Sequence, residues 1–392
     1  MHIDINGNTL KSLRKRYKAN LEAASKMTGF TASQLNDWEQ NNAKVSLTDA
    51  KKIAKGYHSH WSVFLLHSNV GLIKEPVNHR AGYTNGSSFS SNTMRAYEVA
   101  RKLLDSSEEI EGQVVDQRLD EVKKVVRNGA SAKSSAQKVR EIMGISGKEI
   151  MTVTGGPYKV YGFWKYHISA LGVYISEQQM PEEETKAFLL REKNRAVIVV
   201  NKKDSYILSR VFSMLHELGH LVKGESSAAC SVSLSASRFS DEEAWCNKFA
   251  SELLAYDEDV LSNSVVEDLK SMDDPSLEIQ KLATKYKVSF TVMLYKLKKH
   301  DKVTQAQCTE MRSFFENVLL PKIIPKRDPK KEIRLGRAYY VNKDISKASL
   351  NLSREVIEKQ IQGEVSYSEA AKLLDTKTKY LEEIKEAVGF GR

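Results

Sequence analysis

The sequence has few cysteines and no long hydrophobic run, and these absences narrow the kinds of protein it can encode. Three cysteines in 392 residues are too few, and odd in number, for a fold held together by disulfides. No uninterrupted apolar stretch approaches the roughly 20 residues that a membrane-spanning helix needs. Residues 1–20 also lack the apolar core of a signal peptide. We therefore expect a cytoplasmic protein in a reducing environment, without a membrane partner.

Basic side chains outnumber acidic ones, 60 to 50, which gives a net charge of +10. Residues 1–57 hold ten basic and five acidic side chains, so this segment carries half of the chain's net positive charge. A second basic stretch at 321–337 holds seven basic and two acidic side chains, together with three of the seven prolines. A basic surface permits an anionic partner such as nucleic acid but does not require one. We interpret the proline-containing stretch as an exposed linker rather than a second nucleic-acid contact.

Residues 9–57 have the pattern of short helices separated by polar turns. Apolar residues recur at helical spacing from Leu10 onward. A glycine-containing turn precedes Thr31, whose hydroxyl can cap the helix that follows. The segment resembles the helix-turn-helix domain of phage-repressor-like (Xre-type) regulators, whose third helix commonly contains a Trp-Glu pair, here Trp38 and Glu39.

This resemblance implies that the third helix enters the major groove of double-stranded DNA with polar residues toward the base edges. The candidate DNA-contacting residues are Thr31, Ser33, Gln34 and Asn36. Two positions depart from the family pattern, because Leu21 replaces a frequent phosphate-holding Gln and Ser25 replaces a usual Ala. The alternative is a small helical module for protein contact or for homodimer formation.

Further along the chain the composition changes several times. A Gly-, Ser- and Asn-rich stretch at 70–95 predicts a linker, and a charged helical stretch follows it. Residues 151–200 have strand-like runs of β-branched and aromatic side chains. Near the C-terminus, Ser366 and Glu369 have the spacing of a capping box that begins a helix. We expect an α+β fold, predominantly α, with a small β-sheet and a C-terminal helical region.

The most informative motif is His216-Glu217-Leu218-Gly219-His220, which follows an apolar stretch. Residues four apart share one face of a helix, so the two imidazoles can converge on one metal ion. Glu217 lies in an adjacent sector, where it can deprotonate a water molecule. A catalytic zinc site takes three protein ligands and a water, so a third ligand is required. The alternative is a pair of surface histidines on an amphipathic helix.

The motif and its surroundings resemble the ImmA/IrrE-type zinc metallopeptidases. That family joins an Xre-type helix-turn-helix to a strand, a helix with HELGH, and a later helix patterned Glu-x-x-Ala-Asn-x-Phe-Ala-x-x-Leu-Leu. Here the strand corresponds to residues 196–201 and the later helix to residues 243–254. Asn247, Phe249 and Ala250 match the later pattern.

The resemblance implies a zincin-like peptidase core that binds Zn²⁺, with Glu217 as the catalytic residue. The metal ligands it implies are His216, His220 and Glu243. If the helix register is off by one, Glu242 is the fallback third ligand, ahead of Asp241. A helix N-terminus also favours acidic residues through its dipole, which accounts for such a cluster without a metal.

Two cysteines flank the candidate site, Cys230 and Cys246, and the second replaces the family's usual Ala. A thiolate there could ligate or block zinc as a redox switch. The alternative is that both are small buried hydrophobic residues.

Taken together, these patterns predict five segments. They are an Xre-type helix-turn-helix domain at 1–68, a linker and connecting helix at 69–110, an ImmA/IrrE-type metallopeptidase domain at 111–262, a winged-helix-like helical segment at 263–320, and a basic linker with a C-terminal helical domain at 321–392. The resemblance implies a zinc-dependent endopeptidase in a phage, mobile-element or stress circuit, with a helix-turn-helix repressor or antitoxin as its substrate. The alternative is a DNA-binding transcriptional regulator or toxin–antitoxin component in which the zinc site is structural or sensory.

Overall fold

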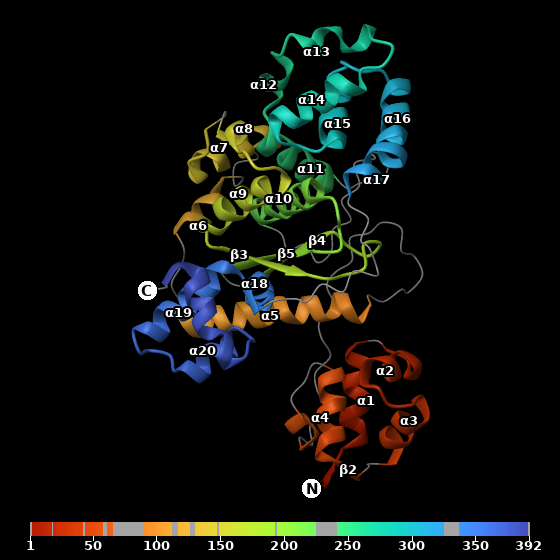
Figure 1. Cartoon of the computed structure of the whole chain (residues 1–392), viewed down its shortest axis with the longest axis vertical. Coiled ribbons are helices and arrows are strands. Elements are labelled where there is room, and N and C mark those ends of the chain that lie inside the picture. The colour runs from red at the N-terminus through yellow and green to blue at the C-terminus, as the bar shows by residue number, and fades with distance from the viewer. Residues whose placement is uncertain are drawn as a thin grey trace. The chain divides into compact units, whose positions relative to one another are not determined.

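The structure is a computed structural model of the chain (Figure 1). It describes residues 2–17, 19–41, 44–57, 61–65, 90–111, 117–125, 130–146, 149–192, 194–224, 241–324 and 337–390. The chain divides into two compact units, and the boundary between Glu98 and Val99 falls inside helix α5 (Ser91–Glu111). In the described residues no helix is long and apolar enough to cross a membrane.

The first unit is a bundle of short helices with a two-stranded sheet. Its elements before α5 are β1 (His2–Asp4), α1 (Gly7–Arg16), α2 (Leu21–Thr28), α3 (Ala32–Asn41), β2 (Lys44–Ser46), α4 (Leu47–Gly56) and the 3₁₀ helix η1 (Trp61–Leu65). Polar side chains cap four of the helices: Asn6 begins α1, Asn20 begins α2, Thr31 begins α3 and Ser46 begins α4. Strand β1 pairs antiparallel with β2.

Close helix contacts and one ion pair hold this unit together. A Cβ added to Gly7 would lie 2.6 Å from the carbonyl oxygen of Glu39, so only glycine lets α1 approach α3 this closely. The guanidinium of Arg14 donates to both carboxylate oxygens of Glu39 at 2.6 Å. Because Glu39 is buried, this bidentate pair satisfies a charge that would otherwise destabilise the unit.

The second unit contains a three-stranded sheet with the order β3-β5-β4. Strand β3 (Val173–Gln178) runs parallel to β5 (Arg195–Asn201), and β4 (Ala187–Glu192) runs antiparallel to β5. All seven residues of β5 are buried, as expected for a central strand covered on both faces. The sequence expectation of a strand at 196–201 is confirmed.

Helices cover both faces of this sheet. After α5, the described helices are α6 (Gln117–Lys124), α7 (Ala132–Met143), α8 (Glu149–Thr152), α9 (Pro157–Ser169), α10 (Ile207–Lys223), α11 (Asp241–Leu254), α12 (Asp257–Leu261), α13 (Val265–Asp268), η2 (Leu269–Ser271), α14 (Ser276–Tyr286), α15 (Phe290–Lys299), α16 (Gln305–Phe314), η3 (Phe315–Leu319), α17 (Leu320–Ile323), α18 (Arg337–Ala348), α19 (Leu350–Ile361), α20 (Tyr367–Leu373), η4 (Thr378–Tyr380), α21 (Leu381–Lys385) and η5 (Glu386–Phe390). Figure 1 shows α9, α10 and α11 on one side of the sheet and α18 and α19 on the other. A single hydrophobic core runs from α7 and the sheet through α10 and α11 to α14, α15 and α16.

The C-terminal helices close the outer edge of β3. The backbone N–H of Ile175 donates to the Ser349 hydroxyl at 3.2 Å, and the Ser176 hydroxyl donates to the Lys347 carbonyl at 2.7 Å. An edge strand covered in this way cannot pair with another chain. The expected capping box is confirmed, because the Ser366 hydroxyl accepts from the backbone N–H of Glu369 at the start of α20.

The fold is mostly helical with small sheets, which agrees with the expected α+β class. Part of the predicted linker at 70–95 and most of the basic stretch at 321–337 lie outside the described residues, as does Cys230.

Candidate metal centre

The HELGH motif lies in the second half of α10, in the interior of the second unit. Every residue from Val211 to Val222 is buried, and the helix ends at Gly224, which adopts φ 84°. His216 and Glu217 have no exposed surface, and His220 is 1% exposed. The alternative of two surface histidines is therefore wrong. Polar groups buried to this extent need a hydrogen-bond partner or a metal ion.

Glycine inside the motif allows the next helix to approach. A Cβ on Gly219 would lie 3.2 Å from the ring of Phe249 and 3.3 Å from the Cα of Cys246. A Cβ at these distances would require Phe249 or α11 to move by a few tenths of an ångström, so Gly219 favours the close packing of α11 against α10. This packing brings the first turn of α11, with Glu243, next to the two imidazoles.

The side chains of His216, His220 and Glu243 converge. The two Nε2 atoms lie 3.2 Å apart, Glu243 Oε2 lies 3.2 Å from Nε2 of His216, and Glu243 Oε1 lies 3.3 Å from Nε2 of His220. A tetrahedral zinc ion with bonds of about 2.0–2.1 Å places its ligand atoms about 3.3 Å apart. Each of these distances is close to the separation of two zinc ligands, and the three side chains form a group that could hold a metal ion.

The chemistry of these atoms also fits a cation. Unprotonated imidazole nitrogens and carboxylate oxygens all offer lone pairs. A proton between the two Nε2 atoms would bridge only those two nitrogens and not the carboxylate. A divalent ion would satisfy all three at once. Nitrogen and oxygen ligands of this kind suit zinc, although they also accept other transition metals.

The two other acidic residues at the start of α11 do not join this group. Glu242 contacts the opposite side of the His220 ring, with 3.0 Å between Oε1 and Nδ1. Asp241 is exposed. The structure therefore brings Glu243 to the inner nitrogens and leaves Glu242 on the outer one, a position that the sequence did not predict.

The thiol of Cys246 lies beside the site but outside the metal group of the described residues. Burial raises the pKa of this thiol, and a hydrogen bond with His220 offsets only part of that effect. These observations favour the interpretation of Cys246 as a small buried hydrophobic residue.

The four residues proposed to contact DNA lie together in the first unit. All of them are exposed, at the N-terminal end of α3 and in the turn before it: Thr31, Ser33, Gln34 and Asn36. Two of them also cap the helix, since the Thr31 hydroxyl accepts from the Gln34 backbone at 3.2 Å and the Gln34 side chain accepts from the Thr31 backbone at 3.0 Å. Helix α3 carries no Lys or Arg, whereas Lys51, Lys52 and Lys55 are exposed on α4.

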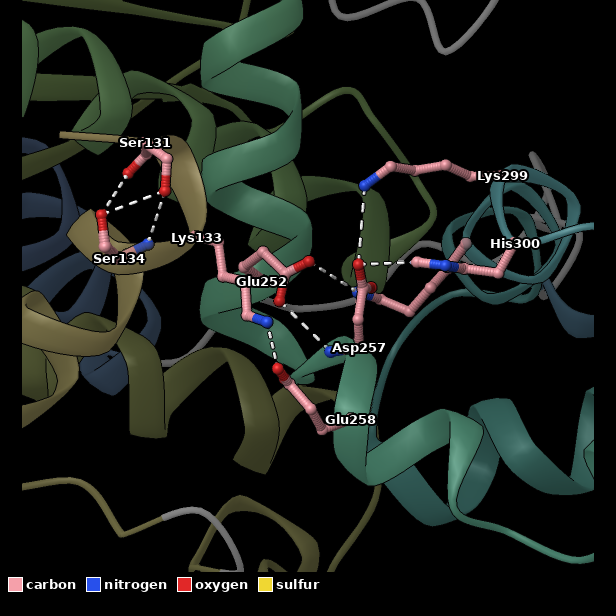
Figure 2. Close-up of polar contacts among 9 residues, drawn as sticks. Ser131, Lys133, Ser134, Glu252, Asp257, Glu258, Lys299 and His300 are labelled. Atoms are coloured by element: carbon pink, nitrogen blue, oxygen red, sulfur yellow. Dashed lines mark hydrogen bonds and ion pairs between the residues drawn. The ribbon is translucent and has the colours of Figure 1, made fainter. Parts of the chain in front are cut away.

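A buried charged cluster that the sequence did not predict connects α11 with α15 (Figure 2). Lys296 forms an ion pair with Asp257, and its Nζ lies 3.6 Å from Oε1 of Glu252. His300 contacts the other oxygen of Asp257 at 2.7 Å, and Lys299 lies 3.5 Å from it. Glu252, Lys296 and Asp257 are all buried.

The pKa values of the two carboxylates in this cluster shift in opposite directions. Burial raises the pKa of Glu252 to about 7, with a contribution from the neighbouring Asp257. Burial would also raise the pKa of Asp257, but a hydrogen bond with Glu252 and the charge of Lys296 hold it well below its usual range. Nothing in the pattern LYKLKK marks Lys296 as buried, because lysines on a helix are usually exposed.

Comparison with known proteins agrees with this site. Residues 168–298, which include β3, β4, β5, α10, α11 and most of α15, match the model of the IrrE N-terminal-like domain, a metallopeptidase family. The match supports a metallopeptidase of the ImmA/IrrE type for this part of the chain. No curated protein and no solved structure shows significant similarity to it.

Proposed function

We propose that the chain is a zinc-dependent endopeptidase that cleaves a helix-turn-helix repressor or antitoxin in a regulatory circuit. The single observation that supports a peptidase is the convergence of two imidazole nitrogens and one carboxylate from two packed helices, with neighbouring atoms 3.2–3.3 Å apart. The match to a metallopeptidase model over the same helices supports it.

Each side chain of the site has a distinct part in this proposal. His216, His220 and Glu243 hold the zinc ion, which when bound polarises a peptide carbonyl and acidifies water. Glu217 takes the proton from the attacking water and delivers it to the leaving nitrogen.

The choice of substrate rests on the first unit rather than on the metal centre. Its sequence resembles the helix-turn-helix of phage-repressor-like regulators, and its α3 presents an exposed polar surface. In this proposal the first unit recruits a repressor or antitoxin, or binds the same operator DNA, so that the peptidase acts on a regulator of its own circuit.

The test is to compare cleavage by the wild type and by Glu217→Gln. Labelling of new protein N-termini in cells that produce either form identifies cleaved proteins without prior choice. The variant is expected to keep its metal and to lose cleavage by about 10²–10⁴-fold, the usual contribution of a general base. Equal sets of new N-termini in both samples would overturn the proposal.

A second candidate function is DNA-binding regulation in which the metal site is structural or sensory. The exposed residues of α3 favour it. It predicts selection of a specific duplex from a random pool, with affinity that falls steeply as salt rises. The double variant Ser33→Ala, Asn36→Ala would lose this selection, and Glu217→Gln would keep it. A chain that selects no sequence at low salt contradicts this candidate.

A further inference from the structure

The two histidines of the metal centre differ at their outer nitrogens. Nδ1 of His220 lies 3.0 Å from Oε1 of Glu242. Nδ1 of His216 is buried and has no hydrogen-bond partner among the described residues. The inner Nε2 atoms of both rings point toward the same place, because they lie 3.2 Å from each other.

We propose that Glu242 is a positioning residue that holds His220 with its proton on Nδ1, so that the lone pair of Nε2 faces His216 and Glu243. This inference rests on the proposed metal centre. A carboxylate can only accept a hydrogen bond from Nδ1, which requires that nitrogen to carry the proton. In a neutral ring Nε2 is then the unprotonated nitrogen, as metal binding requires. An acceptor at the outer nitrogen also fixes the ring plane and increases the basicity of the inner one.

Two consecutive acidic residues in the first turn of α11 contact the two nitrogens of the His220 ring. Glu243 reaches the inner nitrogen of His220 at 3.3 Å, and Glu242 reaches the outer one at 3.0 Å. The Glu242 side chain is 31% exposed, so water competes with it and screens its charge. Cys246, one turn further on, also contacts the ring, but its sulfur is a weak hydrogen-bonding group. Glu242 is therefore the strong acceptor for Nδ1.

The direct test is the tautomer of His220 in the metal-free full-length chain with Glu243→Ala, because Glu243, 3.3 Å from Nε2, otherwise accepts a proton there as Glu242 does at Nδ1. Selective ¹⁵N labelling of histidine distinguishes protonated from unprotonated ring nitrogens by their chemical shifts. In this background we expect His220 to have its proton on Nδ1 when Glu242 is kept and in Glu242→Gln, whose amide oxygen still accepts. In Glu242→Ala the proton is expected to redistribute to Nε2. Shifts of His220 that do not change on Glu242→Ala would overturn the proposal.

Zinc affinity, measured by competition with a chelator, is the second readout. Glu242→Ala is expected to bind zinc about 10–100-fold more weakly than the wild type, the usual effect of losing such a partner. Glu242→Gln should stay within a few-fold of the wild type. Asp241→Ala is the matched control, since Asp241 is the exposed neighbour in the same helical turn, and its affinity should not change. Equal affinities for Glu242→Ala and Asp241→Ala would contradict the positioning role.

A third variant distinguishes loss of the contact between Glu242 and His220 from misfolding. Glu242→Asp keeps the charge at the helix N-terminus but withdraws the oxygen by one methylene. It is expected to shift the tautomer in the same direction as Glu242→Ala, and an unshifted tautomer would count against the proposal. If the wild type binds no zinc at all, the proposed peptidase fails, whereas the tautomer measurement still decides the role of Glu242.

Discussion

Helices α2 and α3 in the first unit and helices α14 and α15 in the second are joined in the same way. Each turn has three residues, and the first residue is left-handed, with φ 79° at Gly29 and 57° at Lys287. The third residue caps the next helix in both cases: the Thr31 hydroxyl accepts from Gln34 at 3.2 Å, and the Ser289 hydroxyl accepts from Val292 at 3.1 Å. The local structure of the two segments is therefore closely similar.

Their second helices face opposite environments. Helix α3 exposes most of its described side chains and buries Leu35 and Glu39, whereas α15 buries six of its ten residues. The turn and cap specify only that a helix begins again after a sharp change of direction. The residues that follow decide whether that helix presents a surface, as ASQLNDWEQN does, or completes a core, as FTVMLYKLKK does.

Each second helix also carries one buried charge that is paired with another element. In α3 it is Glu39, which binds Arg14 of α1, and in α15 it is Lys296, which binds Asp257 at the start of α12. Breaking such a pair leaves a buried charge without compensation. The two segments thus share a buried ion pair as well as a turn. They differ in whether the second helix is exposed or packed in the core.

The largest expected effect comes from breaking the pair in the buried segment. Lys296→Ala leaves Asp257 and Glu252 buried without their cation, and it should lower the free energy of unfolding by about 3–5 kcal/mol. Lys299→Ala, at an exposed neighbour of Asp257, should change it by less than about 0.5 kcal/mol. Chemical denaturation of both variants measures the difference. Equal stabilities would mean that the buried ion pair does not stabilise the packing of α15.

The next comparison uses matched positions, since Asn36 and Leu294 are each the fifth residue of the second helix. Leu294→Ala removes a fully buried side chain and should cost about 2–5 kcal/mol, because a cavity remains. Asn36→Ala should stay within about 0.5 kcal/mol of the wild type, since Asn36 is exposed. Thermal or chemical unfolding followed separately for each unit checks this contrast. A destabilised Asn36→Ala would show that α3 is not a free surface.

The pH dependence of stability should report on Glu252. Its pKa is raised to about 7 in the folded chain, so the folded state holds a proton that the unfolded state releases. The stabilisation from this proton is complete below the unfolded pKa of about 4.3 and is lost as pH rises through about 7.

Glu252→Gln cannot titrate, so between pH 5 and 8 its unfolding free energy should fall less than that of the wild type, by about 1–3 kcal/mol. The opposite contribution of Asp257, whose pKa is lowered, is lost only as the solution becomes more acidic than this range. Lys299 and His300 face Asp257 rather than Glu252 in both proteins, so their effects cancel in the comparison. Parallel curves for the two proteins would refute the buried, protonated Glu252.

The smallest effect should be the same in both segments. Thr31→Ala and Ser289→Ala each remove one cap and should each cost about 1 kcal/mol. The difference between the two variants is expected to be smaller than either loss. A cap that matters in only one segment would show that the two turns are not equivalent.

The features that follow from short sequence patterns were predicted well. The spacing of His216 and His220, the helix that contains them and the strand before it are local, and the structure has each of them. The convergence of Glu243 with the histidines could be anticipated only through the resemblance to known peptidases, because it depends on how α11 packs against Gly219.

Other contacts depend on chain segments far apart and left no local signal. The sequence indicates Glu242 only as a substitute ligand. The register of α11 against α10 decides which nitrogen of His220 Glu242 contacts. The burial of Lys296 depends on carboxylates that arrive from α11 and α12. The closure of β3 by Ser349 joins residues 174 positions apart, and no periodicity in either segment indicates that contact.

Metal content tests the central claim most directly. The full-length chain, purified without added metal, should contain about one zinc per chain by elemental analysis, and Glu217→Gln should contain the same amount. Glu243→Ala should lose it, because two histidines alone do not complete the site. No zinc in the wild type, or equal zinc in Glu243→Ala, would contradict a metal centre built from His216, His220 and Glu243.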